Sequence, residues 1–152
     1  MNPCRKAEKE DLDDILRGES LLFSDPWSRK ALEECLDSPV FESFVCTDGK
    51  SILGYLITST AAGEAEILRI ASFPEHRRKG VAASLLRFFL QRAPKNQTEA
   101  VFLEVRESNL AARNLYEKIG FRPSGLRCGY YSKPREDAVL YQLLIKKEDP
   151  KI

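Results

Sequence analysis

The order of strands and helices in this 152-residue sequence predicts an α/β fold, in which a mixed, partly parallel central sheet has helices on both faces. Two apolar runs flank Asp48-Gly49, a dipeptide typical of a tight hairpin, and so indicate antiparallel strands. Two later apolar runs are each followed by a helix pattern, which favours right-handed crossovers. The predicted strands are residues 3–7, 41–47, 51–60, 65–73, 100–105, 121–131 and 138–145.

Four helices are predicted from apolar residues that recur every three or four positions. The predicted ranges are residues 8–19, 29–36, 81–93 and 110–119. Ser28 and Asn109 are expected to cap the second and fourth helices, because their side-chain oxygens accept hydrogen bonds from free N–H groups. Gly18 lies near the end of the first helix, Pro94 ends the third and Gly120 ends the fourth.

The composition is that of one folded domain, which we assign to residues 1–146, followed by a polar tail at 147–152. Hydrophobic residues make up 43% of the chain, and the net charge of +1 gives no overall attraction to nucleic acid or membrane. The four cysteines form no Cys-x-x-Cys pair and His76 is the single histidine, so we expect no metal site. The sequence shows neither an apolar leader nor a spanning segment, which predicts a cytoplasmic protein.

A basic turn separates the third long strand from the third helix. Arg77, Arg78 and Lys79 precede Gly80 in this turn. A helix N-terminus has unpaired N–H groups and the positive end of the helix dipole, and glycine allows close approach to the backbone, so such a turn can hold a phosphate. The spacing matches neither a Walker loop nor a dinucleotide fingerprint. On this pattern alone, an ordinary turn with solvated cations is the simpler interpretation.

Two polar side chains stand inside apolar patterns. Glu104 lies in the fourth long strand, on the same face as Phe102 and Arg106. It is either the ion-pair partner of Arg106 or of another arginine, which the residues alone favour, or a general base among apolar neighbours. Tyr116 falls on the apolar face of the fourth helix, where a packing role is the simpler interpretation.

The turn Arg77-Arg78-Lys79-Gly80-Val81-Ala82 resembles the Gln/Arg-x-x-Gly-x-Gly/Ala signature of the GNAT acetyltransferase superfamily. The resemblance implies a GNAT-like fold, with this turn binding the pyrophosphate of acetyl-CoA. It also implies that the preceding strand offers its backbone to the pantetheine arm and to the oxyanion. The residues expected to contact acetyl-CoA are Ile70, Ala71, Ser72, Phe73, Arg77, Arg78, Lys79, Gly80, Val81, Ala82, Asn109 and Tyr116.

The segment from Leu103 to Phe121 resembles the Leu-Glu-Val-Arg-x-Ser-Asn-x-x-Ala-x-x-Leu-Tyr-x-x-x-Gly-Phe segment of the RimI-type ribosomal-protein-alanine N-acetyltransferases. Residues 23–28 and 130–138 are similar to two narrower motifs of the same group, so the resemblance covers nearly the whole chain. It implies that Glu104 is the general base and that Tyr116 is the general acid toward the CoA thiolate.

Four residues within the two narrower motifs are candidates for contact with the acceptor. Trp27 either flanks a peptide groove or plugs a loop over the core. Tyr130 and Tyr131 alternate along a strand, so at most one of the two is expected to contact substrate. Glu136 either attracts a basic peptide or belongs to a solvated turn.

The sequence therefore predicts an acetyl-CoA-dependent enzyme that acetylates the N-terminal α-amine of a basic protein, such as a ribosomal protein, by direct attack in a ternary complex. An α-amine with a pKa of about 8 is partly uncharged at pH 7, whereas a lysine at about 10.4 is almost wholly charged. Two alternatives remain: acetylation of a lysine or a small amine, and an acyl-CoA-binding regulator without turnover. We expect a monomer or weak homodimer that contacts neither nucleic acid nor membrane.

Overall fold

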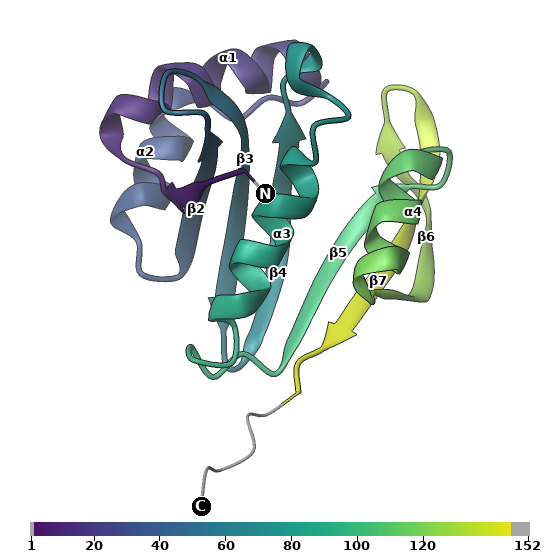
Figure 1. Cartoon of the computed structure of the whole chain (residues 1–152). Helices are drawn as coiled ribbons and strands as arrows, with labels where there is room; N and C mark the ends of the chain where they lie inside the picture. The colour runs from purple at the N-terminus through teal and green to yellow at the C-terminus, as the bar shows by residue number, and fades with distance from the viewer. Residues whose placement is uncertain (1, 147–152) are drawn as a thin grey trace, which may run out of the picture.

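The computed structural model describes residues 2–146, which form a seven-stranded sheet flanked by α-helices (Figure 1). The strands are β1 (Cys4–Lys6), β2 (Phe41–Thr47), β3 (Ile52–Ala61), β4 (Glu64–Ser72), β5 (Ala100–Arg106), β6 (Arg122–Ser132) and β7 (Arg135–Leu144). The α-helices are α1 (Leu12–Leu22), α2 (Arg29–Asp37), α3 (Val81–Arg92) and α4 (Leu110–Ile119). Short 3-10 helices, η1 (Lys9–Asp11) and η2 (Pro74–His76), lie before α1 and α3.

The strand order is β1-β2-β3-β4-β5-β7-β6, and every neighbouring pair is antiparallel except β4 and β5. Helices α1 and α2 pack on one face of the sheet, and α3 and α4 pack on the other (Figure 1). The predicted fold class, a mixed and partly parallel sheet with helices on both faces, is therefore confirmed.

The parallel pair β4–β5 is joined at one end only. Its register runs from Glu64 opposite Ala100 to Glu66 opposite Phe102. Beyond these residues the two strands diverge, and Figure 1 shows the resulting V between them. The sheet is thus divided into two halves that share a short seam, and we call the space between the diverging strands the fork.

A β-bulge in β4 lies close to the start of the fork. Ile57 of β3 pairs with Arg69, whereas the next residue, Thr58, pairs with Ile67. Leu68 is therefore the extra residue of the bulge, and such an insertion reverses the alternation of side chains that follow it. This local irregularity places the Arg69 side chain on the α1 face of the sheet, where it bonds to Glu19.

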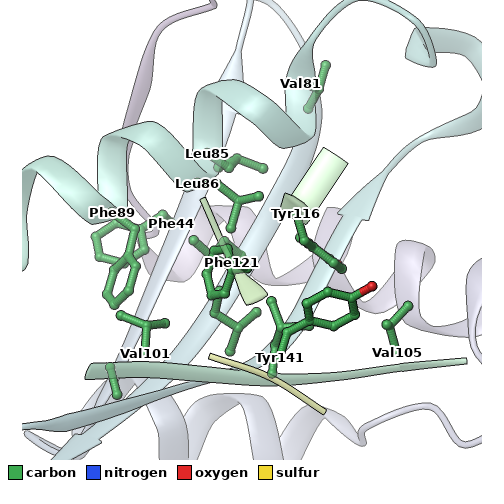
Figure 2. Packing of buried hydrophobic residues seen from close by; sticks show 14 of the residues in the cluster. Phe44, Val81, Leu85, Leu86, Phe89, Val101, Val105, Tyr116, Phe121 and Tyr141 are labelled. Atoms are coloured by element: carbon green, nitrogen blue, oxygen red, sulfur yellow. The ribbon is translucent and has the colours of Figure 1, made fainter. Parts of the chain in front are cut away.

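One continuous apolar cluster on the α3 and α4 face connects the two halves of the sheet (Figure 2). Phe44 and Leu85 contribute from the N-terminal half. Tyr116 lies with its ring centroid 5.9 Å from that of Phe121 and 6.1 Å from that of Tyr141. Each such buried side chain contributes about 1.5–3 kcal/mol, so this cluster, rather than the three-residue seam, holds the halves together.

Several predicted boundaries agree with the structure. The helix predicted at 110–119 and the strand predicted at 41–47 have those bounds. Ser28 accepts a hydrogen bond from the Ala31 N–H at 3.1 Å, and Asn109 accepts one from the Ala112 N–H at 3.2 Å, so both are helix caps. The predicted tail at 147–152 lies outside the described residues, and the assignment of 1–146 to one domain stays a prediction.

The first helix does not end near Gly18 but continues to Leu22. Gly18 instead allows a close approach, because a Cβ atom there would lie 2.6 Å from Cε1 of Tyr55 and 3.2 Å from Cζ of Phe73. The glycine that resembled a stop signal is therefore a packing residue inside the helix.

The connection between β2 and β3 is also different from the predicted two-residue turn. Thr47 pairs with Ile52, so four residues form the loop. The Asp48 carboxylate accepts hydrogen bonds from the N–H groups of Lys50 at 2.9 Å and Ser51 at 2.8 Å. These two bonds stabilise the longer loop through the aspartate side chain.

Candidate active site

Three neighbouring cavities, which share lining residues, lie in and beside the fork. The first, of about 510 Å³, lies on the α3 and α4 face and includes Ala82 and Tyr116 in its lining. The second, of about 370 Å³, occupies the fork and contains Tyr116 and Glu104. The third, of about 480 Å³, lies on the opposite face and also contains Glu104. Tyr116 thus stands where the first two cavities meet, and Glu104 stands where the last two meet.

The basic turn lies at the entrance of the first cavity, at the N-terminus of α3. Gly80 is the N-cap residue, with a left-handed backbone (φ 73°), and a Cβ there would meet no atom within 4 Å. The first backbone N–H of this helix with an intrahelical acceptor is that of Ser84, which donates to Gly80 at 2.9 Å. The preceding N–H groups have no such acceptor in the helix, and Arg77 lines the same cavity. This arrangement can hold an anion such as a diphosphate.

The other predicted residues of the turn have different surroundings. Arg78 is exposed and has a positive φ of 66°. The Lys79 Nζ lies 3.4 Å from Nδ1 of His76, and the Lys79 carbonyl accepts a hydrogen bond from the Asn2 side chain at 2.8 Å. Val81 is buried in the core below the turn. Charge at the entrance thus comes from the mobile side chains, while Val81 anchors the helix.

The four predicted residues of β4 and its end divide into two groups. Ile70, Ala71 and Ser72 line the first cavity, and Ile70 also lines the fork. Phe73 does not: its side chain is fully buried on the α1 face, its N–H donates to Leu53 and its carbonyl accepts from His76. The structure therefore brings three of the four residues to the cavity. The N–H and the carbonyl of Phe73 are both already hydrogen-bonded within the protein.

Tyr116 is 5% exposed, and its burial raises the pKa of its phenol well above the ordinary value. Burial thus favours the protonated hydroxyl beyond the preference that any phenol already has at neutral pH. Asn109, at the start of the same helix, lines both the first cavity and the fork. Its side-chain oxygen caps α4, so the cap orients the helix that carries Tyr116.

Glu104 extends from β5 toward the open face of the sheet, and its side chain is 17% exposed. Its ion-pair partner is Arg127 of β6, at 3.5 Å, and not Arg106. Interaction with the Glu104 carboxylate raises the pKa of the neighbouring Tyr130 phenol to about 12. The predicted pairing with another arginine is confirmed, and the carboxylate remains in contact with two cavities.

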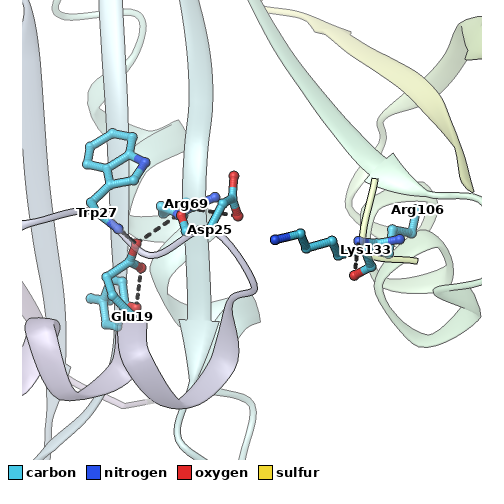
Figure 3. Close-up of polar contacts among 7 residues, drawn as sticks. Glu19, Asp25, Trp27, Arg69, Arg106 and Lys133 are labelled. Carbon is cyan, nitrogen blue, oxygen red and sulfur yellow. Dashed lines mark hydrogen bonds and ion pairs between the residues drawn. The ribbon is translucent and has the colours of Figure 1, made fainter. Parts of the chain in front are cut away.

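The N-terminal wall of the fork is the segment of residues 23–27 between α1 and α2. Arg69 donates to the Asp25 carbonyl at 2.7 Å (Figure 3). The Phe23 ring lies 4.2 Å from the same guanidinium. Trp27 packs against the core and donates its backbone N–H to Glu19, so the structure places it over the core and outside the lining of all three cavities.

The C-terminal wall is the hairpin that joins β6 and β7, residues 131–136. Arg106 of β5 donates to the carbonyl oxygens of Pro134 at 2.9 Å and Lys133 at 3.2 Å, and it stacks on Tyr131 at 4.3 Å. Glu136 binds Arg106 at 3.3 Å and accepts from the Ser108 N–H at 2.6 Å. Glu136 is thus a member of the wall rather than a solvated turn residue.

The two adjacent tyrosines of β6 face different surroundings. Tyr131 lines the fork, whereas Tyr130 is 50% exposed and lies beside Glu104 and Arg127. The alternation expected from the strand pattern is therefore present.

Within residues 2–146, no helix has the length and apolar character to cross a membrane, and no three acidic, cysteine or histidine side chains are grouped as metal ligands.

A model of the acetyltransferase (GNAT) family matches residues 10–121, a span that contains the basic turn, Glu104 and Tyr116. The chain belongs to the GNAT family. The GNAT fold of this chain is similar to the crystal structure of the ribosomal-protein-S18-alanine N-acetyltransferase from Escherichia coli, with a TM-score of 0.88, 30% identity and coverage of 100% of this chain and 99% of that one.

Two relatives support the same assignment. The [ribosomal protein bS18]-alanine N-acetyltransferase of Escherichia coli strain K12 is 31% identical over 95% of this chain and 99% of its own. An N-alpha-acetyltransferase of Saccharolobus solfataricus is 31% identical over 90% of this chain and 89% of its own. The chain is therefore an acetyl-CoA-dependent GNAT N-acetyltransferase, as predicted, related to the RimI type.

Some residues of the site have no motif of their own in the sequence. Glu19 was expected only as the end of a helix, yet it is fully buried beneath the fork. Arg69 and Arg106 hold the two walls. The signal that was available is that each arginine interrupts or ends an apolar strand. Their partners lie between 27 and 50 positions away along the chain, which no local pattern records.

Proposed function

We propose that this GNAT enzyme transfers an acetyl group from acetyl-CoA to the N-terminal α-amine of a protein, with a ribosomal protein that begins with alanine as the physiological acceptor. The order of the three cavities carries the proposal: an anion site at one end, a phenol at the first junction and a carboxylate at the second. Donor and acceptor would approach from opposite faces of the sheet and meet in the fork.

The residues around the first cavity suit acetyl-CoA. The open space above Gly80 and the free N–H groups of α3 fit the diphosphate, and Arg77 adds positive charge. The strand from Ile70 to Ser72 would guide the pantetheine arm, since both cavities adjoin it. Acetyl-CoA supplies the thioester, whose C–S bond is broken as the amine nitrogen forms the new C–N bond.

The two catalytic groups would divide the proton transfers. Tyr116, which is protonated at neutral pH, gives its proton to the departing thiolate, and the amine loses its proton toward Glu104, directly or through a water molecule. An α-amine with a pKa of about 8 needs less help from the base than a lysine at about 10.4. An N-terminal acceptor therefore suits a carboxylate that already shares its charge with Arg127.

The remaining assignments follow from the same arrangement. Tyr131 would contact the acceptor in the fork, whereas Trp27 and Glu136 would act on the acceptor only through the walls they help to form. We propose a cytoplasmic location, where acetyl-CoA and ribosomal proteins are available and four unpaired thiols stay reduced. We also propose a monomer or weak homodimer that requires no metal.

The test uses three acceptors with [acetyl-14C]acetyl-CoA and mass spectrometry: a peptide of about six residues with a free N-terminal alanine, the same peptide with a blocked N-terminus and an internal lysine, and spermidine. We expect acetylation of the first peptide at its α-amine. Acetylation of the blocked peptide or spermidine alone would replace the proposal by the lysine or small-amine alternative, and CoA binding without any product would favour a regulator.

Two variants test the catalytic roles with the preferred acceptor. Tyr116→Phe and Glu104→Gln should each reduce kcat by about 10²-fold or more, because each removes one positioned proton transfer. The apparent affinity for CoA should change much less than kcat, because the basic turn, which would hold the diphosphate, is intact in both variants. Wild-type kcat in Glu104→Gln would refute its role as the base.

A further inference from the structure

The Glu19 carboxylate has no surface exposure, and both of its oxygens accept hydrogen bonds. Oε2 accepts from the Tyr55 hydroxyl at 2.6 Å. Oε1 accepts from Arg69 Nε at 3.0 Å and from the Trp27 N–H at 3.0 Å (Figure 3). Burial of a charge is unfavourable unless it is paired and hydrogen-bonded, and the chain satisfies this carboxylate with three donors from three different segments.

Arg69, which is held by Glu19, in turn binds the segment between α1 and α2. Its Nη2 donates to the Asp25 carbonyl at 2.7 Å and lies 3.5 Å from the Asp25 carboxylate. The Phe23 ring covers the guanidinium at 4.2 Å. The segment is therefore held at three points, namely the Phe23 ring, the Asp25 carbonyl and the Trp27 N–H, and all three depend on the Glu19–Arg69 pair.

The restrained segment is a wall of the reaction site. Ser24, Asp25 and Arg69 line the fork but not the cavity that adjoins the basic turn, whereas Phe23 lines both. Figure 3 shows Asp25 and Lys133 on opposite sides of the gap, with the Lys133 side chain directed across it. An acceptor that enters the fork would pass between these two sides.

We infer that Glu19, Arg69 and Tyr55 are positioning residues that fix the acceptor-side wall of the fork and thereby set the apparent affinity for the acceptor, without contact with the reacting atoms. This inference rests on the proposed function, because it assigns the fork to the acceptor. The bulge at Leu68 is part of the device, since it directs Arg69 toward Glu19 at the point where β4 leaves β5.

A purely structural role would give a different result, and the chain contains a suitable control. Asp11 is also a buried carboxylate, 5% exposed, and accepts from Arg5 at 2.7 and 3.0 Å and from the Glu8 N–H at 2.8 Å. It joins η1 to β1 and lines none of the three cavities. Asp11→Asn therefore weakens a comparable pair without altering the fork.

The experiment compares Glu19→Gln, Tyr55→Phe and Asp11→Asn in the full chain, with the alanine peptide described above as acceptor. For each variant, Tm and the KM values for peptide and acetyl-CoA are measured. We expect Glu19→Gln to raise the peptide KM about tenfold, with acetyl-CoA KM changed less than about threefold. Tyr55→Phe should shift the peptide KM in the same direction by less. Asp11→Asn should lower Tm and leave both KM values near wild type.

Three results would overturn the inference: unchanged peptide KM in both Glu19→Gln and Tyr55→Phe, equal increases in both KM values, or the same peptide KM shift in Asp11→Asn. If Glu19→Gln does not fold, Tyr55→Phe decides the question, because it removes one hydrogen bond and keeps the charge pair. If the wild type acetylates no peptide but acetylates spermidine, the proposed function fails; the same KM comparison with spermidine then tests the wall separately.

Discussion

The two walls of the fork are built by the same device but with different burial. On each diverging strand, one arginine binds the carbonyl of a wall residue and stacks on an aromatic ring: Arg69 with Asp25 and Phe23, and Arg106 with Pro134 and Tyr131. The carboxylate partners differ, because Glu19 is fully buried whereas the Glu136 side chain is 19% exposed.

The difference in burial predicts a difference in stiffness. A buried pair has few alternative partners, so the N-terminal wall has one well-defined position. The Arg106–Glu136 pair of the C-terminal wall is partly exposed, so water can hydrate its charges and salt can screen them. A site with one fixed and one adaptable wall can hold a donor and acceptor in register while the acceptor side chain varies. The following predictions test this contrast, from the largest expected effect to the smallest.

Arg69→Met should be the most damaging wall substitution. It leaves Glu19 charged, buried and without its cation, and breaking such a pair costs about 3–5 kcal/mol in the free energy of unfolding. Urea denaturation followed by circular dichroism measures the loss. Arg106→Met is the matched control. We expect a much smaller loss in its free energy of unfolding, because water can solvate the partly exposed Glu136 carboxylate. Equal losses in the two variants would contradict the proposed contrast.

Gly18→Ala should have the next largest effect. The new methyl group would lie 2.6 Å from Cε1 of Tyr55, so this ring, whose hydroxyl bonds to Glu19, must shift. Overpacking of this kind costs about 1–3 kcal/mol. Gly125→Ala is its counterpart in the C-terminal half, where the nearest atom is the flexible end of Leu140 at 3.3 Å. We expect Gly125→Ala to be close to neutral by thermal denaturation, and a larger loss there than at Gly18 would refute the prediction.

Glu136→Gln should have the smallest effect on Tm, and the size of this effect should depend on pH. Hydrogen bonds from Ser108 and the Arg106 guanidinium lower the pKa of Glu136 below its ordinary value of 4.5. A lowered pKa stabilises the folded state above about pH 4.5, and this stabilisation disappears as pH falls through the folded-state value. The Tm difference between wild type and Glu136→Gln should thus shrink between about pH 5 and 3. A Tm difference that grows on acidification would contradict this prediction.

Much of the fold follows from local sequence. Ser28 and Asn109 cap their helices as predicted, and the strand at 41–47 and the helix at 110–119 have the predicted bounds. These features depend on residues a few positions apart, so periodicity and capping chemistry describe them. The family, and with it the arrangement of the basic turn, Glu104 and Tyr116 in one site, followed from a resemblance that covers nearly the whole chain.

The remaining features depend on residues that are distant in sequence. Gly18 reads as a helix stop until Tyr55 is seen against it, and Glu104 pairs with Arg127 rather than with its strand neighbour Arg106. No glycine or proline lies at the Leu68 bulge, so no local sequence signal predicts it. Such contacts arise from tertiary packing, which overrides local preference, and they are concentrated in the part of the molecule where the sheet divides.

The divided sheet has four strand edges instead of two. The outer edges follow the usual protective pattern, because β1 has only three residues and β6 carries arginines and a proline along its length. The inner edges of β4 and β5 carry the bulge at Leu68 and the charged residues Arg69, Glu104 and Arg106, and they are flanked by α3, α4 and the two walls. The enzyme therefore keeps open backbone edges at its centre without exposing them to aggregation with other copies of itself.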